Sequence, residues 1–106
     1  MLKPTRHRQL SPETIGQVRV WMDAHGVDMV IIGRAIGTVV ITAAHATECN
    51  DGTVTLAVAR LRWREGRTIA LHGISPIEAS HIENAAHRAG VIVSHLLEDP
   101  EGRFRL

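Results

Sequence analysis

The residues best suited to metal or nucleophilic chemistry gather around one predicted loop. His45 and Cys49 stand four positions apart with Glu48 between them, and Cys49 is the single cysteine of the chain. Imidazole and thiolate are zinc ligands, and a Cys–His pair can supply a nucleophile and its base. A complete site needs more ligands, and the chain has neither an HExxH motif nor paired CxxC motifs. We therefore expect no cofactor and assign no catalytic residue, and a zinc protein or enzyme at His45 and Cys49 is the second alternative function.

A second group combines histidine with arginine. The chain has seven histidines, and His81, Arg88 and His95 recur at seven-residue spacing, which places them on one stripe if this region is a single helix. An arginine in the middle of the stripe disfavours a shared metal ion. We interpret the stripe as a solvated flank or as a pH-sensitive contact between copies of the chain, and it is our second candidate surface.

Arginine supplies all but one of the twelve basic residues. Arg60, Arg62 and Arg64 alternate with apolar residues, so a strand would project them from one face, close to Arg67 across a tight turn. Like charges in that position repel one another unless a partner neutralises them. The cluster therefore indicates an acidic protein surface or a phosphate backbone as partner, or a charged hairpin end that discourages aggregation. It is our first candidate binding site.

Composition excludes several protein classes. The chain has 106 residues, 44% apolar and 22% charged, with a net charge of +1, which fits one globular domain and does not favour nucleic acid over protein partners. Three aromatic residues leave little for stacking on single-stranded nucleic acid. Apolar runs are too short for a membrane helix, and the N-terminus lacks the apolar core of a signal peptide. We expect a cytoplasmic protein that does not enter membranes.

The first element that must position these groups is a helix over 12–25. Ser11 can cap it, Pro12 suits its first turn, and Gly26 can end it. We expect residues 1–10 to form a mobile basic arm and residues 11–106 to form one α+β domain.

Between residues 27 and 73 the pattern becomes that of strands. Val27–Ile32 and Thr38–Thr42 are rich in β-branched residues, and Thr47–Gly52 has the composition of a loop. Thr53–Arg64 and Arg67–Gly73 flank a two-residue turn and are predicted to form a hairpin. The prediction for this region is a four-stranded antiparallel meander.

The last region begins with a capping box at Ser75–Glu78. Its apolar residues keep one helical phase across Gly90, so we predict one long C-terminal helix over 76–98. Burial of Ile92, Val93 and Leu96 in the core is expected to outweigh the ~1 kcal/mol cost of glycine in a helix. A turn at 99–102 and a short tail or edge strand at 103–106 complete the chain. The predicted fold is αββββα.

No convergent polar site emerges from these patterns, which favours a function in binding. The prediction is a non-enzymatic interaction module (a regulator, adaptor or stoichiometric inhibitor) that binds a partner protein as a homodimer. The alternative is a nucleic-acid-binding protein that uses the Arg60–Arg67 hairpin and the basic arm with Lys3, Arg6 and Arg8.

Overall fold

The centre of the molecule is a mixed five-stranded sheet, seen in a computed structural model that describes residues 10–33, 38–49, 65–98 and 104–105. In sequence order, its strands are β1 (Met29–Gly33), β2 (Thr38–Thr42), β3 (Ala46–Cys49), β4 (Thr68–His72) and β5 (Ile92–His95). In space the order is β3-β2-β1-β4-β5. The strands at positions 27–32 and 38–42 are confirmed to within two residues, whereas the loop predicted from Thr47 is wrong up to Cys49, which belongs to β3.

The predicted antiparallel meander is only partly correct. β2 pairs antiparallel with both β1 and β3, but β4 runs parallel to β1, with Met29 opposite Ile69, and β5 runs parallel to β4. Because β4 lies between β1 and β5, both of its edges are occupied and none remains for the predicted hairpin. The other half of that hairpin, residues 53–64, lies outside the described residues.

The reason for the parallel pairing lies in the composition of the central strands. Three consecutive residues are buried in β1 and again in β4, where Ile69, Ala70 and Leu71 are at most 2% exposed. A strand that is buried on both faces needs a helix on each side, and parallel strands are connected in that way. The connection from β4 to β5 is such a crossover, made by the helix α3 (Pro76–Arg88).

The predicted long C-terminal helix is wrong. α3 ends at Arg88, Gly90 has a left-handed φ of 73°, and the chain continues as β5. The start of β4 fixes this turn, since Gly66 N–H donates to Gly90 O at 2.9 Å and Ile92 N–H donates to Arg67 O at 2.8 Å. A strand places successive side chains on opposite faces, so Val93 packs towards α3 while Leu96 packs on the other side. Burial and strand hydrogen bonds together outweigh continuation of the helix.

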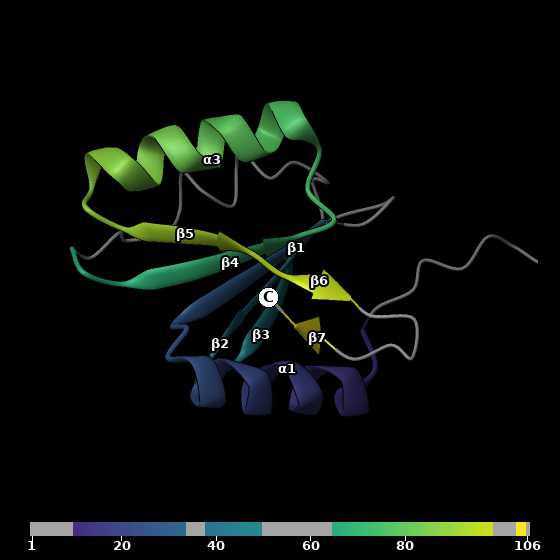
Figure 1. Ribbon diagram of the computed structural model, residues 1–106. Helices are drawn as coiled ribbons and strands as arrows, with labels where there is room; N and C mark the ends of the chain where they lie inside the picture. Colours follow the sequence, from purple (N-terminus) through teal and green to yellow (C-terminus); the bar gives the residue numbers. More distant parts are fainter. Residues whose placement is uncertain (1–9, 34–37, 50–64, 99–103, 106) are drawn as a thin grey trace, which may run out of the picture.

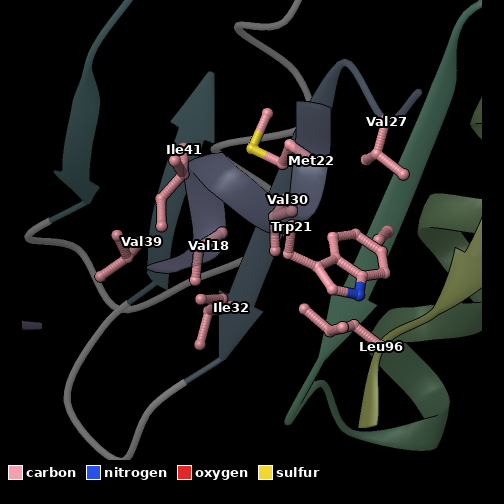
Figure 2. Close-up of a cluster of buried hydrophobic side chains, with 10 residues drawn as sticks. Val18, Trp21, Met22, Val27, Val30, Ile32, Val39, Ile41 and Leu96 are labelled. Atoms are coloured by element: carbon pink, nitrogen blue, oxygen red, sulfur yellow. The ribbon is translucent and has the colours of Figure 1, made fainter. Parts of the chain in front are cut away.

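The two helices that the structure describes cover opposite faces of the sheet, α3 above and α1 (Pro12–His25) below in Figure 1. The boundaries and both caps of α1 are as predicted: Ser11 Oγ accepts from Thr14 N–H at 3.1 Å, and Gly26 ends the helix with φ 65°. Figure 2 shows the cluster between α1 and the sheet, where Val18, Trp21 and Met22 face Val30 and Ile41 of the sheet. Ile82 and Ala86 of α3 pack on the other face.

A small second sheet comes after β5. β6 (Leu97–Glu98) pairs antiparallel with β7 (Phe104–Arg105), with Leu97 opposite Arg105. Of the two alternatives expected at 103–106, a tail or an edge strand, Phe104–Arg105 forms a strand, and the turn predicted at 99–102 lies outside the described residues.

Candidate interaction surface

Of the predicted arginine cluster, the structure describes only Arg67. It stands before β4 and makes an ion pair with Asp28 at 3.0 Å, with half of its own side chain and 38% of the Asp28 side chain exposed. The second Asp28 oxygen accepts from Thr68 N–H at 2.9 Å. Arg67 thus joins the starts of β1 and β4. The structure does not test the prediction for Arg60, Arg62 and Arg64, which lie outside the described residues.

The predicted stripe of His81, Arg88 and His95 is broken, because it required a continuous helix. His81 and Arg88 are exposed on α3, but His95 is the last residue of β5. There its Nε2 lies 2.9 Å from Glu83 Oε1 of α3. The contact shows that the side of α3 that carries Glu83 faces the end strand β5.

His45 lies in the turn between β2 and β3, and Cys49 ends β3. The turn is closed by the backbone, with Thr42 N–H donating to His45 O at 2.9 Å, and the His45 side chain is exposed. No side-chain placement is described for Cys49. Across the described residues, no group of three or more His, Cys, Asp or Glu side chains is arranged to hold a metal ion.

The carboxyl ends of β1 and β4 meet at a pair of glycines. A Cβ atom on Gly33 would lie 2.5 Å from Gly73 O, so the backbone at the two strand ends approaches more closely than any other residue type allows. The adjacent N-terminus of α3 carries its own cap: Ser75 Oγ accepts from Glu78 N–H at 3.3 Å and donates to Glu78 Oε1 at 2.9 Å. A carboxylate already faces these helix donors, which makes this end of the sheet a poor site for an anion.

The outward side of α3 presents a continuous exposed stripe. We call this the α3 stripe, and its members, spaced by four, three and four residues, are Ile77, His81, Asn84 and Arg88. Ile77 is 74% exposed, the highest value among the large apolar side chains that the structure describes as exposed. The buried side of the helix, with Ala79, Ile82 and Ala86, lies opposite.

Sequence reasoning found His81 and Arg88 but missed the apolar member of this stripe. The signal was present, because Ile77 is out of phase with Ala79, Ile82 and Ala86 on a helical wheel. Sequence reasoning also missed the exposure of Ile92. This side chain is 57% exposed, although the long-helix hypothesis had placed it in the core.

Comparison with protein-family models, with curated proteins and with solved structures finds no match. Among the helices that the structure describes, none has the length and apolar character needed to cross a membrane.

Proposed function

We propose that this chain is a non-enzymatic interaction module that binds a partner protein through the α3 stripe and works as a homodimer. The observation that carries the proposal is the 74% exposure of Ile77 on a stripe that ends in the cation Arg88. The two ends of the stripe can serve different purposes in an interface: burial of Ile77 supplies affinity, and the guanidinium of Arg88, about three helical turns further along, supplies orientation.

The charge of the α3 stripe selects the chemistry of the partner. None of its four residues is acidic, and no ion pair of Arg88 is found among the described residues. An uncompensated Arg88 favours a surface that offers a carboxylate, because guanidinium and carboxylate form paired hydrogen bonds. We infer a partner with a shallow apolar pocket for Ile77 and, about three helical turns away, an acidic patch for Arg88.

The other helix provides a matched control surface. At the corresponding positions of α1, the outward residues are Glu13, Gln17, Val20 and Ala24, all exposed. Val20 is 69% exposed, close to the value for Ile77, but this stripe carries an acid and lacks a cation. A partner that responds only to exposed apolar area would bind both helices, whereas an acidic partner would bind α3 alone.

Site-specific photo-cross-linking in the native host tests the proposal. A benzophenone amino acid at position 84 is expected to give a discrete adduct with one protein, and the same group at position 20 is expected to give none. Arg88→Glu should reduce the adduct at position 84 about tenfold, since loss of one oriented charge pair is worth ~1.4 kcal/mol. Val20→Ser should leave it unchanged. An adduct that persists in Arg88→Glu, or that forms equally from position 20, would contradict the assignment.

The nucleic-acid and zinc hypotheses rest on residues 60–64 and on Cys49, so they stay predictions, as does a cytoplasmic location. If the arginine cluster binds phosphate, Arg62→Ala should be retained less strongly on duplex DNA at low salt than the unchanged chain. Equal retention would indicate a solvated cluster.

A further inference from the structure

β5 is an end strand of the sheet, with β4 as its neighbour among the described strands (Figure 1). The backbone N–H groups of Ile92 and Leu96 donate to β4 and the residue before it, at 2.8 and 2.7 Å. Because backbone groups alternate in direction along a strand, those of Val93 and His95 point away from β4. β5 therefore presents two residues whose N–H and C=O groups face outward, separated by Ser94.

Within β5 itself, three of the features with which proteins usually block strand pairing are missing. β5 contains no proline and no lysine, and its register with β4 is continuous over all four residues, without a bulge. Its first residue, Ile92, is 57% exposed. The opposite end strand, β3, carries the acidic residue Glu48. Of the two edges, β5 is the one suited to accept another strand.

We propose that β5 pairs antiparallel with β5 of a second copy of this chain, about a two-fold axis that passes beside Ser94. In this register Val93 lies opposite His95 of the second copy, and the reverse pair completes the symmetry. Each pair exchanges two N–H···O=C bonds, because both residues direct their backbone groups outward. The inference rests on the homodimer of the proposed function and specifies its interface.

The neighbouring registers are less favourable. An axis beside Val93 requires outward groups from Val91, whose N–H already donates to Ala86 O at 2.8 Å. An axis beside His95 requires Leu97, which is paired with Arg105 of β7. Only the axis beside Ser94 uses outward groups that all lie within β5, and this self-complementarity favours a second copy over an unrelated peptide.

The side chains are compatible with this register. Ser94 faces its own copy across the axis, where small hydroxyl side chains pack closely and can form a hydrogen bond. Ile92 comes opposite Leu96 of the second copy, so the dimer covers the Ile92 side chain, which is otherwise exposed to water. The α3 stripe is on the outward side of the helix, away from the sheet, so a dimer formed this way displays two stripes.

A disulfide test reads the register directly. In a Cys49→Ser parent, Ser94→Cys is expected to form a covalent dimer under mild oxidation, because Cα atoms opposite each other in such a pair are ~4.5 Å apart, within the range of a disulfide. Val93→Cys should not form one, since two copies of residue 93 would be about 8 Å apart in this register. Ser80→Cys, exposed on α3, measures cross-linking by random collision.

A second pair of variants tests the edge without a new thiol. His95→Pro removes an outward N–H and leaves the bonds to β4, as proline does on edge strands. His95→Ala also loses the contact with Glu83 but keeps the N–H. Light scattering is expected to show a dimer for the unchanged chain and for His95→Ala, and a shift to monomer mass for His95→Pro at the same concentration. Circular dichroism confirms that both variants are folded.

The outcomes separate this inference from the proposed function. A dimeric mass with no disulfide at position 94, or with a disulfide at position 93 instead, overturns the β5 register and leaves the homodimer. A monomeric mass at every concentration overturns both the register and the homodimer, whereas binding by the α3 stripe is decided separately by the photo-cross-linking at position 84.

Discussion

The two described helices, α1 and α3, begin and end in the same way, but the chain after them differs. α1 and α3 both start at the proline of a Ser-Pro pair, and both end at a Gly-Val pair that stands at the same distance from the serine. In each, the valine N–H donates to the carbonyl five residues earlier: Val27 to Met22 at 2.9 Å, and Val91 to Ala86 at 2.8 Å. Both are Schellman ends, with the glycine in the left-handed conformation.

The difference lies in the residues after each glycine. Gly26 is succeeded by Val27-Asp28, and the acid interrupts the apolar pattern, so the helix visibly stops. Gly90 is succeeded by three apolar residues, of which Ile92 and Val93 continue the helical phase of α3 by coincidence. In this chain a Gly-Val pair after a full-length helix is therefore a stronger stop signal than the phase of the residues beyond it, because phase over a few residues fits either helix or strand.

The largest loss of stability is expected from shortening the buried side chains that pack each helix on the sheet. Ile82 of α3 and Val18 of α1 occupy the same position in the two units and are 1% and 0% exposed. Ile82→Ala should lower the free energy of unfolding by about 3 kcal/mol, and Val18→Ala by about 2 kcal/mol, because the larger side chain leaves the larger cavity. Urea denaturation measures both. A loss below about 1 kcal/mol for Ile82→Ala would mean that α3 does not pack on the sheet as described.

The next loss of stability is expected from alanine substitutions at Gly26 and Gly90. The substitution at Gly90 also distinguishes an α3 that ends at Arg88 from a helix that continues through residue 90. Gly26→Ala should cost about 1 kcal/mol, the strain of a left-handed alanine. Gly90→Ala should cost more, since its Cβ would also lie 2.8 Å from Glu65 Cγ. If α3 ran on through position 90, the same change would instead stabilise the protein by up to ~1 kcal/mol.

Two control variants separate strain from crowding. Gly16→Ala, inside α1 with open space around it, is expected to raise stability by about 0.5–1 kcal/mol. Glu65→Ala combined with Gly90→Ala should bring the cost at position 90 down to that at position 26. If Gly90→Ala and Gly16→Ala change stability in the same direction, the end of α3 is misplaced.

The smallest effect concerns the residues after the two Gly-Val pairs. Asp28 and Ile92 both donate their N–H groups to the start of β4, but only Asp28 adds a carboxylate that accepts from Thr68 N–H and Arg67. Asp28→Ala should cost about 1 kcal/mol because the Thr68 N–H loses its acceptor. Arg67→Ala should cost about 0.5 kcal/mol or less, as for other exposed ion pairs. Equal losses in thermal denaturation would show that the ion pair, and not the backbone contact, stabilises this corner.

The candidate surface was predictable in part. His81 and Arg88 were identified because exposed helical residues are recognised from local polarity, and their exposure does not depend on the surface against which the helix packs. His95 was assigned to the same stripe only because the helix was extended too far, and its actual contact, with Glu83 twelve residues away, comes from the crossover between α3 and β5. Ile92 was placed in the core because the wheel cannot show that a strand at the edge of a sheet exposes one side.

By itself, the sequence determined the local features: the caps at Ser11 and Ser75, the end of α1 at Gly26, and β1 and β2 as strands. These depend on backbone conformations and hydrogen bonds within a few residues. Only the tertiary structure decided that β4 lies between two parallel neighbours and that the chain after Gly90 becomes a strand. Those outcomes depend on which distant backbone groups satisfy one another, and strands of the same composition can pair in either direction until a whole sheet is assembled.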